Sequence, residues 1–262
     1  MKQLIITADD FGASPQVNEA VEIAHREGIL TAASLMVSAP AAADAVARAR
    51  TMPKLRVGLH LTLVDDRPTL PPAQIPGLVD RNGMFRSDMA RAGAAMFFRP
   101  NVRKQLAAEI EAQFKAFAAT GLTLDHVNTH KHFHLHPTIA SLMMRIGKRY
   151  GMNATRVPFE TSNPLAMWLR RSYRAKGMGV ADRVYGLKWS GAMTKDRLGA
   201  ILAALPDGLS EIYMHPATGP YPGSAKGYRY AEELAALTDG RIKHLTATLA
   251  QTGGYSDFPF RV

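Results

Sequence analysis

The chain has no cysteine among its 262 residues, which excludes disulfide bridges, thiolate metal sites and a cysteine nucleophile. Any metal ion must therefore be bound by histidine, aspartate or glutamate. Long apolar runs are also absent. No stretch approaches the roughly 20 apolar residues of a membrane span, and the short apolar start reaches Asp9 and Asp10 too soon to form a signal peptide. We therefore expect a cytoplasmic protein.

Acidic side chains are in deficit, with 22 Asp and Glu against 32 Lys and Arg, and the formal net charge is +10. Such a bias attracts nucleic acid, anionic lipid headgroups or acidic substrates. We find no RNA-recognition signature, helix-turn-helix pattern or glycine-rich nucleotide loop, and so expect no nucleic-acid partner. The chain length suits one large α/β domain or two small ones and allows an ample core, and we expect one domain.

Apolar stretches of strand length alternate with helical patterns, as in βα units around a parallel sheet or barrel. One helix begins at the N-cap pair Ser14 and Pro15 and stops at Gly28. We predict strands over residues 4–8, 32–37, 56–61, 124–128, 154–158 and 211–214. Further helices are predicted over residues 41–50, 102–119, 138–150, 195–204, 231–238 and 242–251.

Two segments interrupt this alternation. Residues 64–99 contain clustered prolines followed by Met and Phe, which predicts a long loop ending in an apolar lip. Residues 160–194 mix large apolar side chains with many Arg and Lys. Long insertions of this kind usually shape a binding site, so we expect both to surround a substrate.

Polar clusters fall at the carboxyl ends of four predicted strands. They are the pair Asp9 and Asp10, His60, the histidine-rich run 130–136, and His215. In α/β barrels and open parallel sheets, ligands and catalytic groups gather at that end of the strands. We therefore expect these clusters to converge on one site.

Each cluster has a structural alternative. Adjacent carboxylates such as Asp9 and Asp10 raise each other's pKa unless a cation or donor offsets the repulsion. They could instead cap the next helix, although Ser14 already supplies a cap. His60 alternates with Gly58 and the apolar residues of its strand, on the face expected inside the barrel, where a single histidine is often a satisfied core group.

Of the nine histidines of the chain, five lie between residues 125 and 137, and four of these form the histidine-rich run 130–136. Extended geometry would direct His130, His132 and His134 into a common cleft and leave His126 within the strand. A solvated polar turn is the alternative. His215 follows a strand pattern and precedes a proline, which fits a histidine aimed at the cleft, although capping or packing would also explain it.

Two imidazoles and one carboxylate form a facial ligand set that leaves metal positions open to water and substrate. Such a site favours hydrolysis. The cation activates a water and polarises the substrate carbonyl, a carboxylate accepts a proton, and a histidine protonates the leaving amine. His25 and His244 lie in helical patterns among charged neighbours, and we assign them no role.

The residues in four motifs resemble the YdjC/ChbG carbohydrate deacetylases, in the same order along most of the chain. The motifs are residues 7–12, residues 57–61, residues 128–134 and residues 213–216. A finer similarity is to the hopanoid-biosynthesis-associated HpnK branch, in residues 31–37, residues 130–137 and residues 221–223.

The resemblance implies a single-domain α/β fold, a deformed, TIM-like (β/α) barrel. It implies one divalent ion, Mg²⁺ or Zn²⁺, held by the equivalents of Asp10, His60 and His130. The resemblance likewise implies that Asp9 is the general base and His215 the general acid. Within the shared motifs we expect four substrate-binding residues: Phe11, His132, His134 and Tyr221.

The reaction implied by the HpnK branch is removal of the N-acetyl group from an N-acetylglucosaminyl hopanoid, a glycolipid. The excess of basic over acidic side chains and the apolar residues 96–98 and 167–169 would suit peripheral contact with the inner face of the cell membrane. These apolar residues could equally cover the barrel core or a homodimer interface.

Two alternatives stay open. The first is a chitooligosaccharide deacetylase. The case for this substrate is weaker because the chain has Lys131 where the chitooligosaccharide members of the family carry histidine. The second is a non-catalytic carbohydrate- or lipid-binding barrel with a structural metal and a closed coordination shell. The residue types do not distinguish Zn²⁺, Mg²⁺, Mn²⁺ and Co²⁺ as the bound ion.

Overall fold

The computed structural model describes residues 1–158, 160 and 164–260. Its strands are β1 (Lys2–Phe11), β2 (Ala32–Leu35), β3 (Arg56–Leu61), β4 (Val127–Thr129), β5 (Arg183–Tyr185), β6 (Gly208–Met214) and β7 (Gln251–Thr252). Its α-helices are α1 (Pro15–Arg26), α2 (Ala42–Arg50), α3 (Met89–Phe98), α4 (Pro100–Ala119), α5 (Pro137–Gly147), α6 (Pro164–Ala175), α7 (Lys195–Ala203), α8 (Tyr230–Thr238) and α9 (Gly240–Leu249). Short 3-10 helices are η1 (Pro72–Gln74), η2 (His130–Leu135), η3 (Lys148–Tyr150) and η4 (Tyr255–Asp257).

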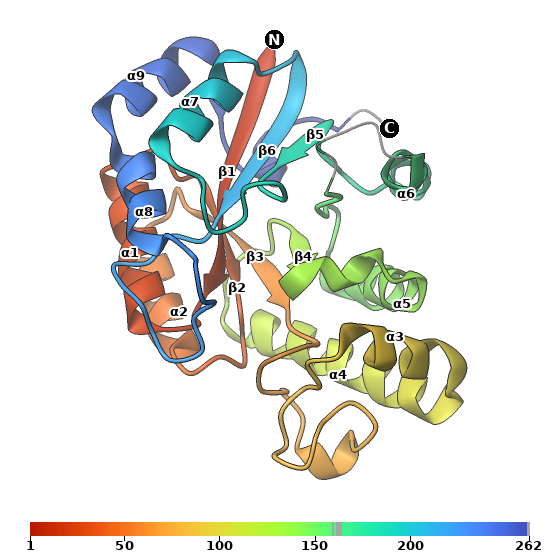
Figure 1. The fold of residues 1–262 in the computed structure, drawn as a ribbon. Helices are drawn as coiled ribbons and strands as arrows, with labels where there is room; N and C mark the ends of the chain where they lie inside the picture. Colours follow the sequence, from red (N-terminus) through yellow and green to blue (C-terminus); the bar gives the residue numbers. More distant parts are fainter. Residues whose placement is uncertain (159, 161–163, 261–262) are drawn as a thin grey trace.

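The strands form one parallel sheet in the order β4-β3-β2-β1-β6-β5, and β7 pairs with the start of β1. Figure 1 shows α1, α2 and α7 to α9 on one flank of the sheet and α3 to α6 on the other. The sheet curls into a half-barrel, so the chain is a single α/β domain with a deformed, TIM-like barrel. The fold predicted from sequence is confirmed.

Side chains of β1 alternate between two environments, as the period of a strand requires. Leu4, Ile6 and Ala8 belong to the large core that the helices cover. Ile5 belongs to a smaller apolar cluster with Tyr255. The inner side of the sheet is therefore apolar near the start of β1 and becomes polar toward its end.

The turn from β1 into α1 follows from local sequence. The Ser14 side chain accepts a hydrogen bond from the Val17 N–H at 3.2 Å, and Pro15 occupies the first turn of the helix. After the helix, a Cβ at Gly28 would lie 2.4 Å from the carbonyl oxygen of Leu237. Close packing of α1 against the end of α8 therefore requires glycine there, and the predicted helix boundaries are confirmed.

The segment 64–99 differs from the predicted long loop because it contains the helix α3. Asp88 caps this helix by accepting a hydrogen bond from the Arg91 N–H. Ala92 and Met96, one turn apart, are buried. The apolar residues expected to form a lip therefore differ in exposure. Met96 is buried in the core, whereas Phe98 is 75% exposed.

The segment 160–194, of which residues 161–163 lie outside the described residues, also contains regular structure. It includes α6 and β5, and β5 pairs with β6. Residues 154–158, predicted as a strand, form only isolated bridges at Ala154 and Thr155. Pro158 has no N–H to extend such pairing.

Across the described ranges, no helix has both the length and the apolar character required to cross a membrane.

Candidate active site

Asp9 and Asp10 both turn into the half-barrel, although neighbouring residues of a regular strand point to opposite faces. The register of β1 against β2 shifts between Ala8 and Phe11. Asp10 has a φ of 62°, a value uncommon for residues other than glycine. This bulge therefore places two adjacent carboxylates at one site.

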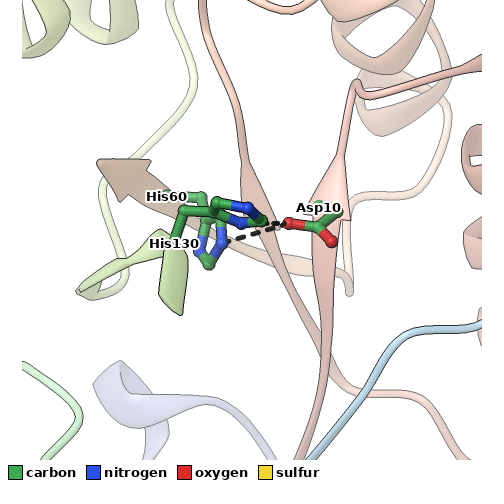
Figure 2. Close-up of side chains that lie close together, drawn as sticks. All are labelled: Asp10, His60 and His130. Atoms are coloured by element: carbon green, nitrogen blue, oxygen red, sulfur yellow. Dashed lines mark hydrogen bonds and ion pairs between the residues drawn. The ribbon is translucent and has the colours of Figure 1, made fainter. Parts of the chain in front are cut away.

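Three predicted ligands meet at the carboxyl ends of β1, β3 and β4. The Oδ1 atom of Asp10 lies 3.2 Å from Nε2 of His60 and 3.0 Å from Nδ1 of His130. Ligand atoms of all three residues lie within 4.8 Å of one another. Figure 2 shows both imidazole rings directed at the same carboxylate.

The contacts of His60 identify which of its nitrogens is available to a cation. Its Nδ1 lies 2.7 Å from Oδ1 of Asn128, an acceptor atom, so Nδ1 carries the hydrogen. Neutral His60 then presents the lone pair of Nε2 toward the Asp10 carboxylate. Two acceptor atoms 3.2 Å apart repel each other unless a proton or a cation lies between them.

The electrostatics of this group also suit a cation. Burial alone would raise the pKa of Asp10, but His130 and His60 beside it hold the pKa well below its ordinary value. Burial lowers the pKa of His130, and the Asp10 carboxylate outweighs this effect and raises it. One carboxylate and two imidazoles form a donor set that fits a divalent ion.

Asp9 belongs to a buried ion network rather than to this ligand group. Its two oxygens accept hydrogen bonds from Arg156, Oδ2 from Nη1 at 2.5 Å and Oδ1 from Nη2 at 3.0 Å. Arg156 also pairs with Glu211, at 2.8 Å. Burial alone would raise the pKa of Asp9, but Arg156 holds it far below its ordinary value, so Asp9 stays ionised.

The predicted extended conformation of the histidine-rich run is wrong. The run folds into η2, in which Lys131 and His132 both have a φ of 53°. His130 and His132 still reach the site, and Nε2 of His132 lies 2.8 Å from the Tyr213 hydroxyl. The left-handed turn, rather than strand alternation, orients these side chains.

His134 is placed behind the site. It is 0% exposed, its Nδ1 lies 2.7 Å from the Thr129 hydroxyl, and its Nε2 lies 2.7 Å from the Arg156 carbonyl oxygen. Burial lowers the pKa of His134 to about 4, so the ring is neutral near pH 7. Its burial and these partners do not support the predicted substrate contact, and His134 instead supports the backbone of Arg156.

Phe11 is likewise enclosed, with 0% exposure in the large core. It is the last residue of β1 and exposes no surface to a substrate, which argues against its predicted role. Tyr221 is half-buried, and its ring lies 5.4 Å from that of Tyr230. Burial raises the pKa of Tyr221, and the charge of Asp10 adds to the effect.

His215 follows β6 among tyrosine rings. Its ring centroid lies 5.9 Å from that of Tyr213 and 5.3 Å from that of Tyr228. Its backbone N–H donates to the buried Glu233 carboxylate at 2.5 Å, and Glu233 also accepts from the Met193 N–H. The helix α8 thus fixes the loop that carries His215.

Three polar residues near the site are not among those predicted from the sequence: Arg156, Glu233 and Asp66. Arg156 lies in a short apolar segment, which is the only hint that its charge is buried. Glu233 belongs to a helix with an ordinary amphipathic pattern. Asp66 follows β3, and burial raises its pKa, with the charges of His130 and Asp10 also acting on it. A second adjacent carboxylate pair, Asp65 and Asp66, is the signal that could have identified it.

The sequence matches the model of the YdjC-like protein family over residues 3–248. It is 34% identical over 254 residues to a protein named carbohydrate deacetylase from Geobacillus stearothermophilus, covering 95% of this chain and 93% of that protein. A protein of the same name from Thermoanaerobacter pseudethanolicus is 28% identical over 217 residues, covering 83% and 82% of the two chains.

One solved structure shares the fold closely. A candidate cellobiose-phosphate cleavage protein from Enterococcus faecalis superposes with a TM-score of 0.82 over 98% of each chain, at 24% sequence identity. Family model, sequence relatives and fold agree over nearly the whole chain. The chain therefore belongs to the YdjC-like family.

Proposed function

We propose that this protein is a metal-dependent carbohydrate deacetylase that hydrolyses the N-acetyl group of an N-acetylglucosamine-type sugar. The observation that carries the proposal is the meeting of Asp10, His60 and His130 at one carboxylate oxygen, close to the ionised Asp9. The relatives named carbohydrate deacetylase support the same substrate class.

In this proposal Asp10, His60 and His130 bind one divalent ion, Mg²⁺ or Zn²⁺. When bound, the ion supplies Lewis acidity toward the amide carbonyl and makes a water molecule a better nucleophile. Three protein ligands would leave further coordination positions of such an ion for water and substrate.

Asp9 is the proposed general base. Arg156 keeps Asp9 ionised, and Asn128 donates to its Oδ1 at 3.2 Å, which orients the carboxylate. A carboxylate with such a low pKa holds a proton only briefly. Asp9 therefore releases this proton to solvent, which restores the carboxylate before the next turnover.

His215 is the proposed general acid that protonates the departing amine. Tyr213 and Tyr228 pack against its ring, and Glu233 fixes its backbone. We propose His132 and Tyr221 as substrate contacts, because both are half-buried beside the site. Aromatic rings of this kind present apolar faces on which a sugar can stack.

The finer substrate that we propose is an N-acetylglucosaminyl hopanoid. Phe98 is 75% exposed and Trp168 is 63% exposed, on helices that flank the half-barrel. Exposed aromatic side chains on a chain with a formal net charge of +10 suit peripheral contact with an anionic bilayer.

A homodimer would bury the same side chains. Retention on anionic but not neutral vesicles supports the membrane, and self-association measured by sedimentation supports the dimer.

The test is mass spectrometry of products after the metal-loaded protein is incubated with N-acetylglucosaminyl hopanoid and, in parallel, with di-N-acetylchitobiose. Loss of one acetyl group from the hopanoid alone is the expected result. Loss from the disaccharide alone would replace the hopanoid by a chitooligosaccharide. No product from either, with a cation bound by four protein ligands, would favour a binding protein and contradict the deacetylase.

A further inference from the structure

A chain of buried hydrogen bonds leads from the base of β4 to the metal-ligand candidate His60. Oδ2 of Asp125 lies 2.9 Å from Nδ1 of His126, and Nε2 of His126 lies 3.0 Å from the Ser34 hydroxyl. The Ser34 hydroxyl accepts from Nδ2 of Asn128 at 2.9 Å. Oδ1 of Asn128 then faces Nδ1 of His60 at 2.7 Å. The chain links three neighbouring strands.

The Asp125 end sets the direction of the first bond. Burial alone would raise the pKa of Asp125, but hydrogen bonds from His126 and from Ser256 lower it to about 2. The carboxylate also accepts from the backbone N–H groups of Tyr255 and Ser256. An ionised carboxylate can only accept, so Nδ1 of His126 carries a hydrogen.

The middle of the chain has one arrangement that satisfies each polar atom. With Nδ1 protonated, a neutral His126 presents Nε2 as an acceptor, and the Ser34 hydroxyl donates to it. The Ser34 oxygen is then free to accept from Asn128. A protonated His126 would leave the Ser34 hydrogen without an acceptor among its described contacts, which a buried hydroxyl avoids.

A second hydrogen bond of Asn128, to Asp9, fixes the orientation of its amide independently of Ser34. Its Nδ2 donates to Oδ1 of Asp9, an oxygen that also accepts a hydrogen bond from Arg156. Both hydrogens of the Asn128 amide are therefore directed at acceptors, and its oxygen is left for His60. Nδ1 of His60 must supply the hydrogen of that bond, so the lone pair of Nε2 points at Asp10.

We propose that Ser34 and His126 are positioning residues, which act through Asn128 to hold His60 in the tautomer that can bind a cation. This inference deepens the proposed metal site and rests on it. Within the described residues, neither Ser34 nor His126 forms a hydrogen bond with Asp10, His60 or His130. Partners beyond the ligand shell commonly fix the tautomer and orientation of metal-binding histidines.

The pairing of strands β2, β3 and β4 brings the members of this hydrogen-bond series together. Ser34 is paired with Gly58 across β2 and β3, and His60 is paired with Asn128 across β3 and β4. A Cβ at Gly58 would lie 2.5 Å from Cε1 of His126. The glycine two residues before His60 therefore leaves the space that the His126 ring occupies.

The test uses the metal-free protein with ¹⁵N-labelled histidine at mildly alkaline pH, where ring nitrogen shifts distinguish the two neutral tautomers. Wild type should show His60 protonated at Nδ1. In Ser34→Ala a population protonated at Nε2 should appear, and the affinity for Zn²⁺, measured by chelator competition, should fall about 10- to 100-fold.

The matched control is Ser210→Ala. Ser210 is a serine of β6, as buried as Ser34, whose hydroxyl has no hydrogen-bond partner within the described residues. Its removal should leave both the tautomer of His60 and the Zn²⁺ affinity unchanged. A general loss of packing would instead affect both variants alike.

A wild-type His60 protonated at Nε2 would overturn the inference without any variant. So would a folded Ser34→Ala protein that keeps the wild-type tautomer and affinity. If Ser34→Ala does not fold, Gly58→Ala, which displaces the His126 ring, serves as the second variant with the same expected changes. A wild-type protein that binds no divalent ion would instead refute the proposed function. Its histidine spectrum would still show whether the hydrogen bonds fix the tautomer of His60.

Discussion

His60 and Asn128 face each other across strands β3 and β4, with Nδ1 of the imidazole 2.7 Å from Oδ1 of the amide. The amide nitrogen of the same asparagine donates to Asp9 at 3.2 Å. One buried side chain thus orients both a ligand of the proposed cation and the proposed general base.

Replacing Asn128 by alanine should therefore weaken metal binding and catalysis together. We expect the Zn²⁺ affinity to fall about 10- to 100-fold, because His60 loses the partner that fixes its ring. Isothermal titration calorimetry measures the affinity, and Asn101→Ala, at an exposed position, is the control. Wild-type affinity in a folded Asn128→Ala protein would contradict the role of the asparagine.

His130→Ala should abolish both metal binding and deacetylase activity while leaving the fold intact. His130 is only half-buried and projects from a short 3-10 helix rather than from the core. Circular dichroism monitors the fold, and His244→Ala, at an exposed position of α9, is the control. An active and metal-replete His130→Ala protein would exclude the proposed ligand set.

Arg156→Met should destabilise the protein by about 3–5 kcal/mol, the usual effect of removing one partner from a buried ion pair. The substitution leaves Asp9 and Glu211 buried without their shared cation. Urea unfolding provides the measurement. Arg229→Met, which breaks an exposed pair with Glu232, should change stability by less than about 1 kcal/mol. Equal effects of the two substitutions would be inconsistent with the network.

His215→Gln should reduce kcat by about 10²- to 10⁴-fold on a sugar amide, because the departing amine needs a proton. On an activated aryl ester, whose leaving group departs without protonation, the reduction should be much smaller. The ratio of the two rates separates an acid from a residue that only shapes the site. Equal losses on both substrates would refute the assignment of His215 as general acid.

Asp125 should make stability depend on pH in the acid range. Its pKa falls from 3.8 to about 2 on folding, so its contribution is complete above pH 4 and disappears as the pH falls toward 2. The contribution is about 2 kcal/mol. The difference in unfolding free energy between wild type and Asp125→Asn should therefore shrink by that amount between neutral and acid pH. A difference that does not change with pH would contradict the prediction.

The parts of the site predicted from sequence are those with local signals. Strands β1 and β3 read as short apolar runs, and each brings a polar ligand to its carboxyl end. Ser14 and Pro15 marked the start of α1 through capping chemistry alone. Convergence of Asp10, His60 and His130 then followed from the geometry of parallel sheets.

The remaining features depend on distant contacts or on departures from regular geometry. Strand periodicity would place Asp9 and Asp10 on opposite faces, and only the bulge brings them together. Arg156 pairs with Asp9 across 147 positions of the chain, which no local pattern encodes. The left-handed backbone at Lys131 and His132 likewise reversed the expectation that His134 would face the cleft.

The central claim is that one divalent ion is held jointly by Asp10, His60 and His130. Anomalous diffraction from crystals grown with Zn²⁺ or Mn²⁺ tests it most directly, because the signal locates the ion without reference to activity. The account predicts a single strong peak bonded to these three side chains, with the remaining coordination positions not filled by protein. A peak elsewhere in the molecule, or an ion enclosed by four protein ligands, would contradict it.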